Sequence, residues 1–201
     1  MNDNNILAVI LAGGKSKRFG EDKNLAKLGS ISLIEHTIYK IREKFKKILI
    51  IANNDLKVEE FKDIEIIPDH IKGNLGPLVG VLTAMKWAKH SKENYKWIAT
   101  FPSDTPFFDS SIIEKYEKKI IKNDSPLYFV RSDDKRHNIF GLWSLDLLDI
   151  LEKDIVKNNF RKVEDWANKI GVKTINIKFK KFDTFLNINT KEDLIEAEKI
   201  L

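Results

Sequence analysis

The chain has 201 residues, of which 42% are hydrophobic and 32% charged, and its formal net charge at pH 7 is +5. This length and composition are typical of one globular domain with a substantial core, and they exclude a disordered protein. The sequence has no cysteine, which excludes disulfides and thiolate metal sites, and no apolar stretch approaches the roughly 20 residues that cross a bilayer.

Apolar runs of strand length alternate with helically spaced apolar residues along the chain. The sequence predicts strands at Ile6–Leu11, Lys47–Ala52, Ile64–Ile67, Trp97–Phe101, Leu127–Arg131, Ile139–Trp143 and Thr174–Ile177. It predicts helices at Ile31–Phe45, Asp55–Phe61, Pro77–Lys89, Ser110–Ile121, Leu145–Glu152, Val163–Ile170 and Lys191–Ile200. The last helix is expected to begin after Thr190, where Thr190 and Asp193 approximate a capping box.

This alternation favours an α/β fold in one domain spanning residues 1–201. We expect a mostly parallel sheet with helices on both faces, which gives three α/β/α layers. Ligands of such sheets bind beyond the carboxyl ends of the strands, so polar motifs that directly follow a strand are candidates for a functional site.

The segment after the first predicted strand is rich in glycine and cations. Residues 11–23 read Leu-Ala-Gly-Gly-Lys-Ser-Lys-Arg-Phe-Gly-Glu-Asp-Lys. Glycine lets the backbone approach a polyphosphate closely, and Lys and Arg side chains neutralise its charge. The spacing matches neither a Walker loop nor a dinucleotide-binding Gly-x-Gly-x-x-Gly. The segment therefore predicts a phosphate-binding loop, the alternative being a glycine-rich turn with a solvated basic face.

Two further polar motifs follow predicted strands or precede a helix. Asp104 comes directly after the strand Trp97–Phe101, and one carboxylate with phosphate oxygens and waters is a normal environment for Mg²⁺. Asn187 and Asn189 precede the last helix, and alternation along an extended segment would point both amides to one side. Alternatively, Asp104 shapes a turn and the asparagines form a turn and helix cap.

The glycine-rich pattern and the Asn-x-Asn-Thr segment at 187–190 resemble the nucleotidyltransferases with a Rossmann-like fold, and among them the molybdenum cofactor guanylyltransferase (MobA) family. The resemblance runs from Leu11 to Thr190. It implies transfer of GMP from GTP to molybdopterin, with Mg²⁺ as cofactor and release of pyrophosphate. It also implies a cytoplasmic enzyme whose N-terminal part binds GTP and whose C-terminal part binds molybdopterin.

The resemblance also assigns roles to single residues. Lys23, Asp104 and Arg18 would be catalytic, with Asp104 as the metal ligand and with Lys23 on the α- and β-phosphates. Arg18 and Lys15 are weaker candidates for the same phosphate contacts. The nucleotide would be bound by Leu11, Ala12, Gly13, Gly14, Lys23, Asn53, Asp69, Gly76, Pro77, Asp104, Asn187 and Asn189.

The chain departs from the family's pattern near the base and the metal. Ile51 stands where members often carry the first amide of Asn-x-Asn, so contact with guanine there would come from backbone or from Asn53. Ser103 stands where a cysteine often precedes the metal-binding aspartate. The first departure leaves the preference between guanine and cytosine open.

A polar cluster between two predicted strands is the candidate for the second substrate. Arg131, Arg136 and His137 lie in or beside the predicted loop Ser132–Asn138, and such a basic loop would hold the terminal phosphate of molybdopterin. The family has His-Pro in this region, whereas Asn138 follows His137 here. A solvated hairpin loop is the competing interpretation.

Other functions stay open from the sequence. They are a cytidylyltransferase acting on molybdopterin, a related sugar or metabolite nucleotidyltransferase, and a non-catalytic nucleotide-binding protein. Nucleic-acid binding is disfavoured because lysine is scattered along the chain and five residues are arginine. The expected partners are GTP, molybdopterin and, transiently, proteins that deliver molybdopterin or accept the finished cofactor, with no nucleic acid and no membrane.

Overall fold

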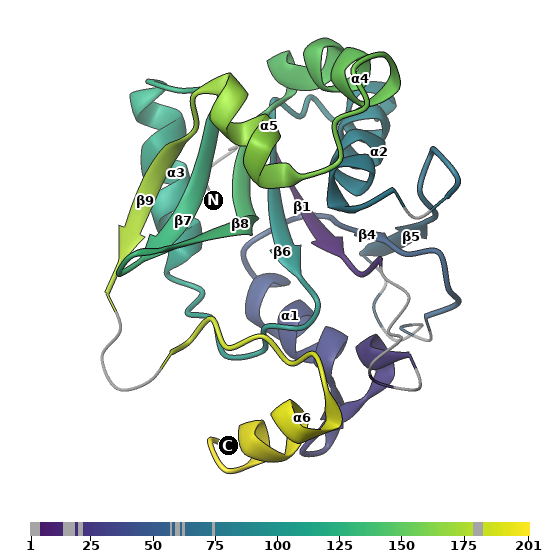
Figure 1. Cartoon of the computed structure of the whole chain (residues 1–201), viewed down its shortest axis with the longest axis vertical. Coiled ribbons are helices and arrows are strands. Elements are labelled where there is room, and N and C mark those ends of the chain that lie inside the picture. Colours follow the sequence, from purple (N-terminus) through teal and green to yellow (C-terminus); the bar gives the residue numbers. More distant parts are fainter. Residues whose placement is uncertain are drawn as a thin grey trace.

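A seven-stranded sheet forms the centre of the protein (Figure 1). The computed structural model describes the chain except residues 1–4, 14–18, 20–21, 57, 59–60, 62, 74 and 179–182. The strand order is β5-β4-β1-β6-β8-β7-β9. β8 runs antiparallel to both of its neighbours, and the other neighbouring strands are parallel.

The strands of this sheet are β1 (Ile6–Leu11), β4 (Ile48–Ile51), β5 (Ile64–Ile67), β6 (Trp97–Pro102), β7 (Leu127–Ser132), β8 (Lys135–Ser144) and β9 (Lys173–Ile177). A separate antiparallel pair comprises β2 (Lys27–Leu28) and β3 (Ile31–Ser32). The α-helices are α1 (Leu33–Ile41), α2 (Pro77–His90), α3 (Ile112–Lys122), α4 (Leu148–Val156), α5 (Val163–Ile170) and α6 (Lys191–Glu198). Short 3-10 helices are η1 (Lys23–Leu25) and η2 (Leu145–Leu147).

Side chains alternate between two cores, one on each face of the sheet. In β1, Ala8 and Ile10 pack with α1 and α3, whereas Leu7 and Val9 pack with α2, α4 and α5. Figure 1 shows α2, α4 and α5 gathered on one side. The three-layer α/β/α prediction is confirmed, because each central strand is apolar on both faces. Among the described residues, no helix has both the length and the apolar character that crossing a bilayer requires.

Most predicted elements are present, with shifted ends. The helix expected over Ile31–Phe45 is shorter, because residues 31–32 form β3 and Ser32 then caps α1 in a capping box with Glu35. The predicted capping box of Thr190 and Asp193 is confirmed. For the helix predicted over Asp55–Phe61, the described residues are not helical and the remainder lie outside the described part.

The predicted loop Ser132–Asn138 is wrong. The chain reverses within Asp133 and Asp134, and β8 begins at Lys135. Asp133 takes a left-handed conformation with φ 47°, which aspartate tolerates in tight turns. β8 pairs with β6 over Gly141–Ser144, so the first half of β8 has β7 as its strand partner. That half carries polar residues, which hid its strand character in the sequence.

Register brings the polar motifs to one edge of the sheet. Leu11 at the end of β1 lies opposite Ile51 in β4 and Pro102 in β6. The loops after these three strands therefore start side by side. A third small core, which includes Phe19, Ile188 and Ala197, packs α6 beside β2 and the start of α1 and brings the segment before α6 to the same edge.

Gly141 in β8 lies in a tightly packed part of the core, against the Trp143 and Phe129 rings. A Cβ at this position would lie 2.4 Å from Trp143 Nε1 and 2.8 Å from Phe129 Cε1, and both rings are buried. We expect Gly141→Ala to lower the free energy of unfolding by about 1–3 kcal/mol, the usual cost of overpacking a core. Urea denaturation followed by circular dichroism measures this, and an unchanged midpoint would contradict it.

Candidate active site

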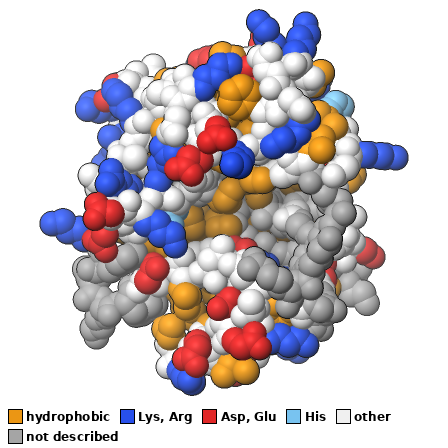
Figure 2. All heavy atoms as spheres, viewed as in Figure 1, with side chains coloured by type: hydrophobic (Ala, Val, Ile, Leu, Met, Phe, Trp, Pro, Cys, Tyr) orange, Lys and Arg blue, Asp and Glu red, His pale blue; other side chains and the backbone are white. Residues whose placement is uncertain are grey.

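A cavity of about 740 Å³ opens where β1, β4 and β6 end. Figure 2 shows this hollow near the middle of the face, with hydrophobic side chains inside it. Of the residues that the sequence assigns to nucleotide binding, those lining the cavity are Leu11, Gly13, Asp69, Gly76, Pro77, Asp104 and Asn187. The opposite wall is formed by β8 and by the segment before α5.

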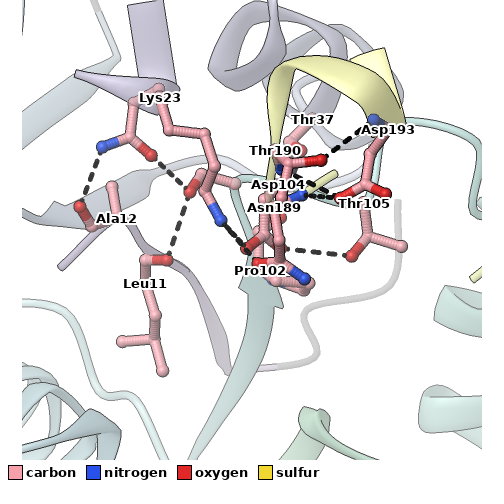
Figure 3. Close-up of polar contacts among 12 residues, drawn as sticks. Leu11, Ala12, Lys23, Thr37, Pro102, Asp104, Thr105, Asn189, Thr190 and Asp193 are labelled. Carbon is pink, nitrogen blue, oxygen red and sulfur yellow. Dashed lines mark hydrogen bonds and ion pairs between the residues drawn. The ribbon is translucent and has the colours of Figure 1, made fainter. Parts of the chain in front are cut away.

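Lys23, Asp104 and Asn189 meet beside this cavity, although they lie far apart in the sequence. The Lys23 Nζ atom lies 2.6 Å from Asp104 Oδ2 and 3.1 Å from Asn189 Oδ1. In Figure 3 the Lys23 side chain extends towards these two residues, which come from other elements. The Lys23 and Asp104 side chains are 16% and 18% exposed. Partial burial makes this ion pair stronger than a surface pair, and the two charges offset each other.

Buried Asn24 fixes the position of Lys23. Its Nδ2 atom donates to the Ala12 carbonyl at 3.0 Å, and its Oδ1 atom accepts from Ser103 Oγ at 2.6 Å. Asp22 also holds Asn24 in place. Its Oδ1 atom caps η1 by accepting a hydrogen bond from the Asn24 backbone N–H. One amide thus joins the ends of β1 and β6 to η1. Asn24 is not predictable as a site residue, because the Lys23-Asn24 pair gives no signal that separates it from a surface asparagine.

The segment before α6 is tied to the Asp104 turn through its backbone. The Ile188 N–H donates to the Asp104 carbonyl at 2.9 Å. Asp193 Oδ2 accepts from the N–H groups of Asn189 and Thr190 at 2.8 and 2.9 Å. Ile188 is fully buried, and Asn187 and Asn189 on either side face the site. No strand is assigned to this described segment, yet its side chains alternate as expected.

Asn53 and Asp69 form a reciprocal pair at the end of β4 and β5. Asn53 Nδ2 donates to Asp69 Oδ2 at 2.8 Å, and the Asp69 backbone N–H donates to Asn53 Oδ1 at 3.0 Å. Both ends of the Asn53 amide are therefore used to orient Asp69. Asp69 lines the cavity and Asn53 does not. The amide acts on the site through the carboxylate.

The N-terminus of α2 faces the cavity. Gly76 precedes the helix with φ 93°, a conformation that side chains other than glycine rarely adopt. A Cβ on Gly76 would also lie 3.4 Å from the Arg161 carbonyl oxygen. Pro77 follows at the first helical position, where its missing N–H costs nothing. The partial positive charge of the helix N-terminus is thus directed at the cavity.

The opposite wall is basic and aromatic. Arg136 lines it and is held by α5, since its guanidinium donates to Asn168 Oδ1 at 2.9 Å and to Glu164 Oε1 at 3.4 Å. His137 lines it as well, and its ring stacks on Phe185 with centroids 4.1 Å apart. Its Nε2 atom lies 2.5 Å from Ser132 Oγ.

Burial governs the charge of His137. Loss of hydration, with a smaller contribution from the Lys135 charge, lowers its pKa to about 4, although the Asp183 charge acts in the opposite direction. The imidazole is consequently neutral near pH 7. It presents an apolar ring and hydrogen-bonding nitrogens to the cavity but no positive charge for a phosphate.

The chain matches the MobA-like NTP transferase domain family over residues 8–169. The chain belongs to this family. A molybdenum cofactor guanylyltransferase of Rhizobium rhizogenes is 32% identical over 96% of the chain and 90% of the relative, and one of Nitrobacter hamburgensis is 26% identical over 96% and 92%.

Solved structures agree on the fold. Molybdopterin-guanine dinucleotide biosynthesis protein A of Archaeoglobus fulgidus superposes with a TM-score of 0.74 at 23% identity, covering 96% of this chain and 97% of that one. A 4-diphosphocytidyl-2C-methyl-D-erythritol synthase of Anaerococcus prevotii gives a TM-score of 0.72 at 13% identity, covering 99% and 96%. These likenesses establish the fold, and the family resemblance in the sequence is confirmed.

Five other predicted residues of the MobA-like site are not among the described residues that line the cavity. Gly14, Lys15 and Arg18 lie outside the described residues. Ala12 is buried, and its N–H donates to the Ile51 carbonyl at 3.0 Å, so it does not line the cavity. Arg131 does not line it either, because its guanidinium turns to Asp133 and Asp134 in the β7–β8 turn.

Two cations of the cavity wall were missed by the sequence analysis. Arg161 and Lys162 precede α5 and line the cavity. They lie between two predicted helices and not after a strand, so the search for motifs at strand ends passed over them. Their basic character in a short loop is a signal, although a weak one in a chain with scattered lysines.

The His137 ring should titrate with a midpoint near pH 4. The unfolded chain takes up a proton near pH 6.5, the ordinary value, whereas the folded protein takes it up near pH 4. This contribution to stability is therefore complete above pH 6.5 and is lost as the pH falls towards 4. NMR titration of the His137 Hε1 proton measures the midpoint, with His137→Phe assigning the signal. A midpoint at or above 6.5 would refute the neutral imidazole.

Proposed function

We propose that the protein transfers GMP from GTP to molybdopterin and releases pyrophosphate. The observation that carries the proposal is the meeting of Lys23, Asp104 and Asn189 at the edge of a cavity large enough for two substrates. The named activity of relatives that match nearly the whole chain supports the choice of substrates. We further expect the enzyme to work in the cytoplasm, with transient contacts to proteins that deliver molybdopterin or accept the product.

GTP would occupy the half of the cavity formed by β1, β4, β6 and α2. The glycine loop would follow its phosphates, and the N-terminus of α2 would add partial positive charge. Asp69, held by Asn53, would contact the guanine nucleotide. Ile51 offers no amide to the base, so Asp69 and backbone groups would provide the polar contacts.

Asp104 and Asn189 would hold Mg²⁺. Carboxylate and amide oxygens are the hard ligands that this ion takes, together with phosphate oxygens and waters. Both oxygens already contact one cation, Lys23 Nζ, which supports their use as a cation site. The described residues contain no group of three or more His, Cys, Asp or Glu side chains that could hold a metal, so phosphate oxygens and waters would have to complete the shell. When bound, Mg²⁺ would neutralise charge on the phosphates.

The reaction needs positioning and electrostatics more than proton transfer. An oxygen of the molybdopterin phosphate would attack the α-phosphorus of GTP, and the bond from that phosphorus to the bridging oxygen would break. The electron pair leaves with pyrophosphate, and Lys23 would stabilise its charge. The nucleophile is already an anion, so no general base is required. Arg161 and Lys162 would bind the acceptor's phosphate on the opposite wall, beside the neutral His137 and Phe185.

A cytidylyltransferase acting on molybdopterin is the second candidate. The specific observation in its favour is Ile51. It stands where guanylyltransferases of the family often carry an asparagine, so the side chain at this position offers no amide to the base. The fold is compatible with either GTP or CTP as the nucleotide, because a 4-diphosphocytidyl-2C-methyl-D-erythritol synthase has the same fold. Pyrophosphate release with molybdopterin, Mg²⁺ and each of GTP, CTP, ATP and UTP decides between them. Release with GTP supports the proposal, release with CTP supports the alternative, and release with neither refutes both.

Lys23→Met and Asp104→Asn should each lower kcat at least about 100-fold, the scale for removing one preorganised electrostatic contact. Circular dichroism should show an intact fold. Lys27→Met is the matched control, since Lys27 is exposed in β2 and does not line the cavity. Wild-type rates in either active-site variant would refute the assignment.

Asn53→Leu should raise the KM for GTP by about 10-fold, because Asp69 loses the amide that orients it and a lost hydrogen bond to a charged group is worth about 1.5 kcal/mol or more. The kcat should change little, since Lys23, Asp104 and Asn189 are held by other contacts. Steady-state kinetics at saturating molybdopterin separate the two constants. An unchanged KM would contradict the role of the pair.

A further inference from the structure

Asp154 in α4 is a buried carboxylate outside the cavity, with a side chain that is 1% exposed. Three side chains donate to it. Trp166 Nε1 lies 2.9 Å from Oδ2, Asn158 Nδ2 lies 2.7 Å from Oδ1, and Lys169 Nζ lies 2.6 Å from each oxygen. A buried charge is stable only with such partners, so the local structure is built around it.

These contacts join α4, α5 and the loop between them. Trp166 and Lys169 belong to α5, and Asn158 belongs to the loop at residues 157–162. The loop is also held through the Asp154 backbone, whose carbonyl accepts from the Phe160 N–H at 3.0 Å. One residue therefore fixes both ends and the middle of the loop.

The same loop carries the cations of the acceptor wall. Arg161 Nη1 donates to the carbonyls of Ile155 and Phe160 at 2.9 and 2.7 Å, and its Nη2 donates to Asn159 Oδ1. Asn159 takes a left-handed conformation with φ 59°, which marks a tightly folded loop. The Arg161 backbone packs against Gly76 at the N-terminus of α2. These contacts thus fix the position of the loop at residues 157–162 on the rim of the cavity.

We propose that Asp154 is a positioning residue for the acceptor site, holding in place the loop that carries Arg161 and Lys162 along the cavity wall. The inference rests on the proposed function for the identity of that acceptor. Asp154 touches neither substrate, so its effect is on acceptor binding and not on the chemical step, whose groups come from η1, β6 and the segment before α6.

The chemistry of the cluster requires a carboxylate. Each oxygen of Asp154 faces N–H donors, and an ionised carboxylate accepts without donating. Asparagine has nearly the same shape, but in one orientation its NH₂ group would face the Trp166 indole N–H, and in either orientation it carries no charge to offset the Lys169 ammonium. Burial raises the pKa of Asp154, yet the hydrogen bonds from Lys169, Asn158 and Trp166 outweigh it and lower the pKa below its ordinary value. The carboxylate is ionised at neutral pH.

Asp154→Asn in the full chain tests the proposal, with Asp124→Asn as the matched control. Asp124 also accepts a hydrogen bond, from Tyr128 Oη at 2.6 Å, and pairs with Lys122 and Lys173 at 3.0 and 3.1 Å. It lies before β7, at the edge of the sheet opposite the cavity. Both variants should lose thermal stability, so the control separates loss of stability from loss of position.

We expect Asp154→Asn to raise the KM for molybdopterin about 10-fold with kcat changed less than about 3-fold, since misplacing a binding group weakens binding without removing a reacting one. The KM for GTP should stay within about 3-fold, and Asp124→Asn should leave all three constants near wild type. An equal KM for molybdopterin in both variants, or a loss confined to kcat, overturns the proposal.

A direct binding measurement distinguishes failure of the proposed function from failure of the positioning role of Asp154. If the wild-type protein releases no pyrophosphate from any nucleotide with molybdopterin, the proposed function fails. Fluorescence titration with molybdopterin then tests the loop without turnover. Weaker binding by Asp154→Asn than by Asp124→Asn supports the positioning role, and equal binding, or none by the wild type, overturns it.

Discussion

The parallel pairing of β1 with β6 in a single register is the constraint on which the site depends. It places Leu11 opposite Pro102, so the glycine loop and the Asp104 turn leave the sheet at neighbouring points. Asn24 and Ser103 then join the two loops by a buried hydrogen bond, and Ile188 brings the segment before α6 to the same turn. Lys23, Asp104 and Asn189 meet because backbone and buried polar contacts leave them no other arrangement. A group held in this way loses little further freedom when substrate binds.

The two halves of the cavity are built differently. The half proposed for the nucleotide consists of loops that follow parallel strands, and strand register sets their positions. The half proposed for the acceptor consists of the first part of β8 and the loop before α5, and no register fixes that loop. Side chains do so instead, through Arg136 between β8 and α5 and through Asp154 between α4 and α5. The halves touch where the Arg161 backbone packs on Gly76, so movement of either loop would change the space between the substrates.

The sequence predicts the framework better than the acceptor wall. The bounds of β1, β5 and α5 and the cap of α6 agree with the structure, because apolar periodicity and capping chemistry are local properties. The early start of β8 was missed, since a strand half that faces a cavity carries the polar residues of a loop. Asn24, Arg161 and Lys162 were missed because their importance arises from contacts with distant parts of the chain. Arg131 does not line the cavity for the converse reason: its hydrogen-bond partners are two and three residues away.

The distribution of charge explains why the two substrates would be bound in different ways. The nucleotide half carries the carboxylates Asp69 and Asp104, which repel a polyphosphate unless a cation stands between them. Among the described residues, Lys23 offsets Asp104, and under the proposed function a divalent ion entering with the triphosphate would offset further negative charge. The proposed acceptor half has a mainly basic composition, with Lys135, Arg136, Arg161 and Lys162 along one wall, one carboxylate, Glu164, paired with Arg136, and a neutral histidine among them. Under the proposed function, a monophosphate would bind such a wall without a metal. The metal would then act in the half that the parallel strands hold, where the bond to phosphorus would be exchanged.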